Sequence, residues 1–584
     1  MGRSSRAAMD THRTDILILG SGGAGLFAAL HAKETDPSLR VTVAVKGLLG
    51  KCGCTRMVQG GFNVALSPDD SVERHFMDTI EGGKWLNRQD LAWTLVTGAQ
   101  TRIRELENEL GCFFDRNPDG TIHQKAFAGQ SFDRTVHKGD LTGIEIINRL
   151  MEQVWARDIE RLEDHRGVAL IPSTAGQRLS GVLFIDMRSG KFRLVRAKAV
   201  LLATGGGPTM YKYHTPSGDK SCDGMAMALR TGLPLRDMEM VQFHPTGLLA
   251  GPDTRMTGTV LEEGLRGAGG WLLDGNGERF MARYDERGER ATRDIVSRAM
   301  IEEMRNGDAT PLGGLYLQMR HLGADTVRQQ FKGMVERCAD CGFDLAGGRV
   351  EVVPTAHYMM GGIEFENDCR TDRPGLYAAG EDTGGVHGAN RLGGNGVANS
   401  TVFGGLAGEY MAAFVAAHQD WTEPNPVLLE QAIADCVAPL RRPVANLHAV
   451  RERLYDIMWE QVGVIRDGPG LRDAGSTLSD LDAELDSLGV PGDSLAFNLT
   501  WHDWLNLKNL ILVSRAIAAA ALARTNSRGA HYRSDFPEPG PLATSHYTKV
   551  VFTGDDFHVQ KPPVQFNLVR PGESLLRPQE AQGA

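Results

Sequence analysis

The chain of 584 residues lacks the features that mark several common classes of protein. It has no uninterrupted apolar run of the roughly 18–20 residues that a membrane-spanning helix needs. No apolar core of a signal peptide follows its charged N-terminus. Its net charge of −10 argues against nucleic acid as a partner. We therefore expect a globular protein of several domains, because one hydrophobic core does not grow to this size.

Cysteine is sparse as well, with eight residues scattered along the chain. Only Cys338 and Cys341 have the spacing of a metal-ligand pair, and without a second pair we expect no zinc site. The multi-cysteine runs that bind iron–sulfur clusters are missing too. The cysteines are expected to be reduced thiols in the cytoplasm. If electrons leave through iron–sulfur clusters, a separate subunit must carry them.

Glycine, in contrast, is frequent and stands in apolar surroundings. An apolar run at 15–19 predicts a buried parallel strand, a helical pattern follows at 26–33, and 41–45 is predicted to be the next strand. The turn between the first strand and the helix has the sequence Gly20-Ser-Gly-Gly-Ala-Gly25. Its glycines, Gly20, Gly22, Gly23 and Gly25, would let the backbone approach a pyrophosphate at the helix N-terminus. The pattern predicts a dinucleotide-binding unit rather than a chance glycine turn. Lys46 stands where an NAD site would have an acid, which weakens the hypothesis of an NAD site.

Further patterns predict the order of the domains. Buried strands at 197–204 and 375–379 are expected to belong to the same sheet, and helical periodicity dominates after residue 408. The block from Gln242 to about Pro354 is richer in polar turns, which predicts an inserted lobe. The tail after Arg524 is expected to be extended. The predicted fold class is α/β, with a Rossmann-like domain, an inserted α+β capping domain, a helical domain and an extended C-terminal segment. The expected boundaries are 10–243 with 355–407, 244–354, 408–528 and 529–584.

Three segments place cations and histidines among small residues. In the segment from His387 to Asn395, Arg391 stands among glycines. This composition suits an arginine that binds an anion with two parallel hydrogen bonds. A tight turn with a surface arginine has the same composition. The string Gln-Phe-His-Pro-Thr-Gly contains His244, and His-Tyr-Met-Met-Gly-Gly contains His357. Arg391 by itself suits a small anion, particularly a carboxylate, whereas a lone histidine in such a turn is structural more often than not.

These strings, in this order, resemble the flavoprotein subunits of succinate dehydrogenases and fumarate reductases, a superfamily that includes L-aspartate oxidases. The resemblance also rests on the glycine turn, on Pro374-Gly-Leu-Tyr-Ala-Ala-Gly-Glu381 and on a tail segment at 526–537 that is close to a family signature. It runs from about residue 14 to residue 537, most of the chain. It implies that FAD is the cofactor and that a small dicarboxylate such as succinate or fumarate is the substrate, with hydride transfer at flavin N5. It further implies an iron–sulfur subunit, a membrane anchor with quinone, and a peripheral location on the cytoplasmic side of the cell membrane.

The resemblance also assigns residues. Arg293 matches the proton-transferring arginine, and Glu263 and Arg266 match the relay that leads to it. The residues that match or replace substrate contacts are His244, His357, Arg391, Phe127 and Glu262. The residues that match flavin contacts are Gly20, Gly22, Gly23, Gly25, Lys46, Cys54, Thr55, Gly60, Gly61, Thr204, Gly205, Gly206, Asp223, Glu381, Arg391 and Asn395. Phe127 could equally be an ordinary core residue.

Three positions depart from the family pattern. Cys54 replaces the histidine that attaches FAD covalently in many members, so we expect noncovalent FAD. Glu262 replaces a threonine that binds a substrate carboxylate, and like charges about 4 Å apart cost on the order of 4 kcal/mol at an effective dielectric of about 20. Gly396 replaces a serine, and Asn399 replaces an acid. Another small acid, such as L-aspartate, is therefore a second candidate substrate, and a non-catalytic flavoprotein is the third hypothesis.

Overall fold

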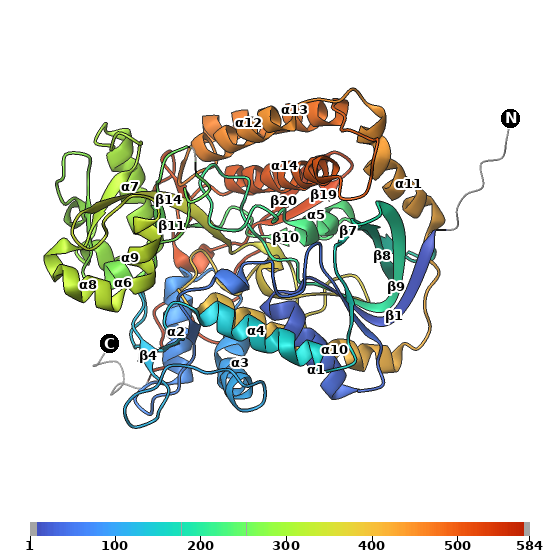
Figure 1. Ribbon diagram of the computed structural model, residues 1–584, viewed down its shortest axis with the longest axis horizontal. Helices are drawn as coiled ribbons and strands as arrows, with labels where there is room; N and C mark the ends of the chain where they lie inside the picture. The colour runs from blue at the N-terminus through green and yellow to red at the C-terminus, as the bar shows by residue number, and fades with distance from the viewer. Residues whose placement is uncertain (1–8, 177, 253, 577–584) are drawn as a thin grey trace.

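The computed structural model describes residues 9–176, 178–252 and 254–576. Residues 1–8 lie outside this description, and so does the prediction about a signal peptide that rests on them. Residues 577–584, the end of the expected C-terminal segment, lie outside it as well. A mixed sheet forms the centre of the expected dinucleotide-binding domain (Figure 1). Its strands, in spatial order, are β6 (Glu160–Leu162), β2 (Val41–Ala44), β1 (Asp10–Leu19), β9 (Lys191–Leu202), β8 (Leu179–Asp186) and β7 (His165–Pro172), and β16 (Leu376–Ala378) pairs with β9.

Two helices lie against each other beside this sheet. Helix α1 (Gly23–Thr35) follows β1, and α10 (Asn395–Ala417) packs along it. A Cβ atom on Gly404 or Gly408 would lie 2.6 or 2.3 Å from a carbonyl oxygen of α1, so only glycine permits this approach. The helix that was predicted from residue 408 begins earlier, at Asn395. The expected domain boundary at residue 407 consequently falls inside α10.

The inserted segment forms a separate lobe, on the left of Figure 1. An antiparallel sheet orders β11 (Val241–Leu248), β14 (Arg349–Met359), β13 (Leu315–Gln318) and β12 (Trp271–Leu273). Its helices are α6 (Gly264–Gly267), α7 (Arg293–Arg305), α8 (Ala324–Gln330) and α9 (Lys332–Ala339). Strands β11 and β14 run back towards the central sheet, so the lobe is joined to the larger domain at the two ends of the insertion.

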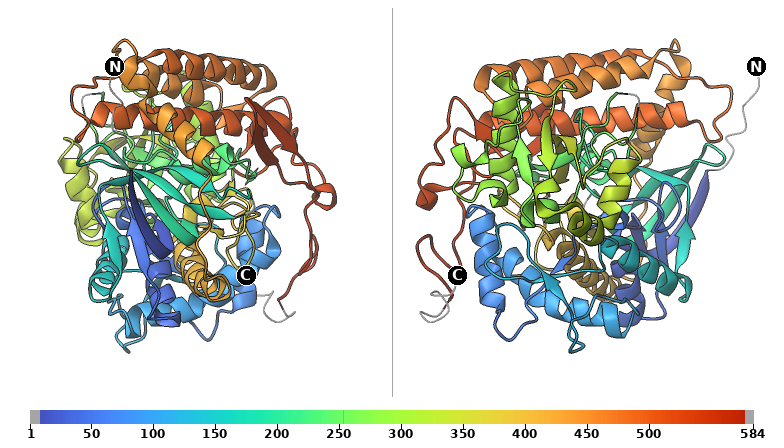
Figure 2. Two further views of the ribbon diagram at one scale, coloured as in Figure 1. Left: turned by 90° about the vertical axis from the view of Figure 1, so that its right-hand side faces the viewer. Right: turned by 60° about the vertical axis from the view of Figure 1, so that its left-hand side comes forward.

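Long helices form a layer along the top of the molecule in Figure 1, and Figure 2 shows the same layer from two other sides. They are α12 (Leu447–Glu460), α13 (Gly468–Ser487) and α14 (Leu499–Ala523). By length and composition α14 could cross a membrane, but 72% of its most apolar window is buried inside the protein. Lys508 and Arg515 interrupt its apolar sequence, which is why no uninterrupted run of this length was expected. Its burial marks α14 as a core helix.

The tail contains extended segments, as predicted, and two of them are paired in a sheet. Strands β19 (Lys549–Thr553) and β20 (Asp556–Gln560) form a hairpin that joins β10 (Leu235–Arg236) and β15 (Gly362–Ile363) in one sheet. The remaining segments lie over the surface, as predicted, and Val569 contacts the helix α3 (Gln89–Asn108) through Gln89.

Candidate active site

A cavity of about 540 Å³ lies where the central sheet, the capping lobe and α10 meet. Most of the predicted site residues line it, although they come from segments far apart in the sequence. The lining includes Gly20, Gly22, Gly23, Lys46, Cys54, Thr55, Gly60, Gly61, Phe127, Thr204, Gly205, Asp223, His244, Glu262, Glu263, Arg293, His357, Glu381 and Arg391. Among the predicted residues, Gly25, Gly206, Arg266 and Asn395 do not line it.

One end of the cavity is built for a phosphate group. The glycine turn connects β1 to the N-terminus of α1, where free N–H groups and the helix dipole favour an anion. A Cβ atom on Gly25 would lie 2.0 Å from the carbonyl oxygen of Gly20, so Gly25 serves the tight turn rather than the ligand. The turn is tied to the opposite wall by a hydrogen bond from the Gly23 N–H to Thr55 Oγ1, 3.1 Å long.

Lys46 is paired with an acid from another element. Its Nζ donates to Asp223 Oδ2 at 2.7 Å, and Arg166 donates to the other carboxylate oxygen at 3.0 Å. Asp223 is the first residue of α5 (Asp223–Arg230). Burial alone would raise the pKa of Asp223, but the two cations outweigh it and lower the pKa well below the usual range. Asp223 thus gives Lys46, which follows the second strand, a buried counter-charge.

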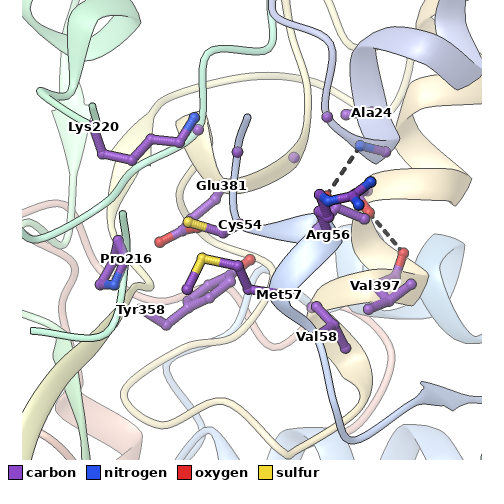
Figure 3. A pocket seen from close by; sticks show the side chains of 18 of the residues that line it. Ala24, Cys54, Arg56, Met57, Val58, Pro216, Lys220, Tyr358, Glu381 and Val397 are labelled. Atoms are coloured by element: carbon purple, nitrogen blue, oxygen red, sulfur yellow. Dashed lines mark hydrogen bonds between the residues drawn. The ribbon is translucent and has the colours of Figure 1, made fainter. Parts of the chain in front are cut away.

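The middle of the cavity gathers Cys54, Lys220, Tyr358 and Glu381 (Figure 3). Glu381 Oε1 accepts hydrogen bonds from the N–H groups of Met359, 3.0 Å, and Gly207, 3.4 Å. Gly206 lies behind Glu381, because a Cβ atom there would be 2.8 Å from Glu381 Oε1. Burial raises the pKa of the Cys54 thiol to about 12, so it is protonated at neutral pH.

The N-terminus of α10 opens towards this part of the cavity through Gly394, Gly396 and Val397. Its unpaired N–H groups favour negative charge there. The side chain of Asn395 turns the other way, where its Oδ1 accepts from Asn63 Nδ2 at 2.8 Å and its Nδ2 donates to Thr79 at 3.1 Å. Asn395 can therefore contact a cofactor only through its backbone.

Glu263 joins two buried arginines. Its Oε2 accepts from Arg293 Nη2 at 2.7 Å and from Nε at 3.2 Å, while Oε1 accepts from Arg266 Nη2 at 3.3 Å. Arg293 is the first residue of α7 and lines the cavity, whereas Arg266 is buried behind Glu263. Burial alone would raise the pKa of Glu263, but Arg293 and Arg266 outweigh it and lower the pKa. The three side chains thus form a connected path that ends at the cavity.

The part of the cavity beside Arg293 and Arg391 carries positive charge. Burial lowers the pKa of His244 and of His357 well below the usual range, and Arg293 lowers both further, so both imidazoles are neutral. Their rings lie 5.4 Å apart. Burial and the nearby Arg293 also lower the pKa of Arg391 to about 10, which leaves it charged at neutral pH. Two guanidinium groups and two neutral imidazoles suit a carboxylate ligand.

The Glu262 side chain lines the cavity and has no hydrogen bond or ion pair among the described residues. Burial raises the pKa of its carboxyl group, with Lys125 and Arg337 opposing the shift. Phe127 lies across the cavity, where a Cβ atom on Gly60 would be 2.7 Å from its ring. Phe127 is thus a wall of the cavity rather than an ordinary core residue.

Gln242 and Tyr358 are among the residues of the site that were not predicted from the sequence. Gln242 accepts from Arg293 Nη1 at 3.1 Å and donates to the Arg391 carbonyl at 2.7 Å, so it links the two arginines. Tyr358 lines the cavity with its ring 4.2 Å from the Arg391 guanidinium carbon. Both belong to the strings that contain His244 and His357, and that position was the signal that could have identified them.

Known proteins show the same organisation. The model of the FAD-binding domain matches residues 15–397, and that of the fumarate reductase flavoprotein C-terminal region matches residues 451–577. One subunit of the fumarate reductase (CoM/CoB) of Methanothermobacter marburgensis is 40% identical over 537 residues, which cover 91% of this chain and 96% of the relative. The flavoprotein subunit of the 8-methylmenaquinol:fumarate reductase of Wolinella succinogenes is 35% identical, with 89% and 86% covered. A structure of a variant of the E. coli quinol fumarate reductase matches with a TM-score of 0.91 and 32% identity, covering 97% of this chain and 99% of the other.

Fold and site together define an FAD-dependent oxidoreductase with a capping domain and a helical domain. The cavity fits the cofactor, because its lining combines a glycine turn at a helix N-terminus, the buried acid Asp223 and a second helix N-terminus. More specifically, the chain belongs to the family of flavoprotein subunits of fumarate reductases and succinate dehydrogenases.

Proposed function

We propose that this chain is the catalytic subunit that interconverts fumarate and succinate. The arrangement that carries the proposal is the path Arg266–Glu263–Arg293, which ends beside the anion-binding Arg391 and the two neutral histidines. When bound, FAD supplies the hydride or accepts it. Arg391 and the histidines bind and polarise a substrate carboxylate, which activates the adjacent carbon–carbon bond.

In this proposal Arg293 transfers the proton. An arginine is an unusual acid because its pKa normally exceeds about 12. Glu263 holds Arg293 in place and can return a proton to it, while Arg266 connects Glu263 to the far side of the lobe. In the reductive direction one carbon receives the hydride and the other receives the proton, so the double bond becomes a single bond and the sums of atoms and electrons balance.

We also propose that an iron–sulfur subunit takes up the electrons and passes them on to a quinone in the membrane. The chain would then be peripheral, held by partner subunits on the cytoplasmic side. In support, the eight cysteines form no cluster-binding run, and two similar proteins are named for quinol-linked complexes. Another relative is named for CoM and CoB instead, so the electron partner of this chain needs its own measurement.

A substrate panel tests the function. The purified FAD-loaded chain should reduce fumarate with a reduced viologen dye and oxidise succinate with an artificial acceptor. Absence of both activities would refute the proposal. If L-aspartate instead produced hydrogen peroxide, the second candidate that Glu262 motivates would take its place.

Noncovalent attachment of FAD is a separate proposal. The Cys54 thiol is protonated at neutral pH, and the thiol is a far weaker nucleophile than the thiolate. We expect acid precipitation to leave all the flavin in the supernatant, and Cys54→Ser to retain the same FAD content as the wild type. Yellow colour or flavin fluorescence that stays with the denatured wild-type chain, and is lost in Cys54→Ser, would contradict it.

Glu262 should make substrate binding depend on pH. Its pKa is raised by burial, so below that pKa the group is neutral and can donate a hydrogen bond to a carboxylate. As pH rises through the pKa, the ionised group repels a dicarboxylate, and we expect KM for fumarate to rise. In Glu262→Gln this rise should disappear, and Glu262→Thr should behave similarly. A KM that follows the same pH profile in all three proteins would rule out this role.

A further inference from the structure

Arg391 has unusually little compensation for its charge. It is buried, and no carboxylate of the described residues forms an ion pair with it. Its Nε has no hydrogen-bond partner among the described residues, and its Nη1 makes only a long contact of 3.4 Å with the Leu392 carbonyl. An arginine that must meet a carboxylate with two parallel hydrogen bonds needs a fixed plane. Something other than hydrogen bonds must therefore fix the plane of this guanidinium.

The ring of Tyr358 lies against the Arg391 guanidinium. The guanidinium carbon lies 4.2 Å from the ring centroid, which is the distance of a close cation–π contact. Burial raises the pKa of the Tyr358 hydroxyl above its usual range, so the ring is a neutral phenol and not a tyrosinate. The attraction therefore comes from the face of the ring rather than from an ion pair.

Tyr358 is itself buried and packs against His387. It lies at the end of β14, and its hydroxyl is 3.4 Å from His387 Nε2. The two rings meet edge to face, with centroids 5.5 Å apart and planes at 79°. Burial and Arg391 keep His387 neutral by lowering its pKa well below the usual range. The ring of Tyr358 is thus fixed by a neighbour from the same loop that carries Arg391.

Gly396 leaves the space for this stack. A Cβ atom at Gly396 would lie 3.1 Å from Arg391 Nη1 and 3.3 Å from the Tyr358 ring. A Cβ atom there would make tight contacts with both partners, so the guanidinium and the ring would each have to shift by a few tenths of an ångström. The glycine that departs from the family pattern is therefore part of how this chain positions its arginine.

Resting on the proposed function, we propose that Tyr358 is the positioning residue of the anion clamp: its ring face sets the plane in which Arg391 meets the substrate carboxylate, and Gly396 keeps room for this arrangement. Tyr358 acts through Arg391 and takes no part in proton transfer. Its loss should therefore weaken the binding of every carboxylate that Arg391 holds, including ligands that do not react.

The experiment compares Tyr358→Leu with Tyr358→Phe in the purified FAD-loaded full chain. Malonate, a dicarboxylate that cannot be reduced, is titrated while the visible absorbance of the flavin is followed, and KM and kcat for fumarate are measured in parallel. We expect Tyr358→Leu to raise the malonate Kd and the fumarate KM by about ten- to thirtyfold, with a smaller change in kcat. Tyr358→Phe keeps the ring and should stay within about threefold of the wild type.

A double-mutant cycle locates the effect on Arg391. In the Arg391→Lys background, Tyr358→Leu should raise the malonate Kd by less than about threefold, because a lysine does not stack in the same plane. Tyr410→Leu serves as the matched control, since Tyr410 is exposed on α10, the helix that carries Gly396. FAD content and the thermal midpoint report whether each variant is folded.

Three results would overturn the inference. They are an unchanged malonate Kd in Tyr358→Leu, equal losses in Tyr358→Phe and Tyr358→Leu, or strictly additive effects in the cycle. If Tyr358→Leu does not fold, Gly396→Ala replaces it, because a methyl group at that position would push on the Arg391 guanidinium and the Tyr358 ring. A fumarate KM of Gly396→Ala within about twofold of the wild type would then overturn the inference. A wild type that is inactive with dicarboxylates and does not bind malonate would instead refute the proposed function, and this inference with it.

Discussion

Arg293→Lys is expected to lower kcat for fumarate reduction by about 10²–10⁴, the usual contribution of a positioned general acid. The lysine keeps a positive charge in the cavity, so anion binding should suffer less than turnover. It cannot keep the present geometry, in which one guanidinium meets Glu263 with two nitrogens and Gln242 with a third. The loss should therefore appear mainly in kcat.

The measurement is steady-state fumarate reduction with a reduced dye, together with the FAD content of the variant. Arg305→Gln is the matched control, because Arg305 is the exposed last residue of the same helix α7. A kcat for Arg293→Lys within about tenfold of the wild type would remove Arg293 from the role of proton donor.

Local sequence patterns could predict the glycine turn and the pair Glu263 and Arg266, because each of these features is formed by residues close together in the sequence. A strand, a glycine turn and a helix need only neighbouring residues, and Glu263 and Arg266 are three positions apart. The comparisons confirm the family and the fold that the sequence resemblance indicated. The pairing of Glu263 with Arg293 joins residues 30 positions apart, and only the resemblance suggested it before the structure showed the contact.

Other features depend on distant contacts that no local pattern encodes. The acid that pairs with Lys46 comes from α5, and the early start of α10 follows from its packing on α1. Gln242 was overlooked because its function is to hold two arginines rather than to bind a ligand. The hairpin β19–β20 was missed because its partner β10 is a two-residue strand more than 300 positions away. The local sequence of the tail predicts extended structure, but the distant strand with which an extended segment pairs depends on tertiary contacts.

Glu263→Gln is expected to damage both turnover and stability. In turnover the amide cannot carry a proton between Arg266 and Arg293, so kcat should fall by about 10²-fold or more. In stability the substitution leaves two buried guanidinium groups without their shared counter-charge. Removing one partner of a buried ion pair costs about 3–5 kcal/mol, and the thermal midpoint should fall accordingly.

The pH dependence of that loss separates this explanation from a simple packing defect. The folded-state pKa of Glu263 is below its ordinary value of 4.5, because Arg293 and Arg266 outweigh its burial. A carboxyl group with a depressed pKa contributes its stability above the unfolded-state pKa, and that contribution disappears as pH falls through the folded-state pKa. The difference in stability between wild type and Glu263→Gln should therefore be full at neutral pH and shrink below about pH 4.5.

The neighbouring Glu262→Gln is the matched control for stability. Glu262 forms no ion pair among the described residues, and burial raises its pKa, so an amide there removes no counter-charge and should leave the thermal midpoint nearly unchanged. Thermal unfolding of both variants between acidic and neutral pH, followed by circular dichroism, decides the matter. If Glu263→Gln were as stable as Glu262→Gln at neutral pH, Glu263 could not be the charge that holds Arg266 and Arg293 together, and the relay would have to be built differently.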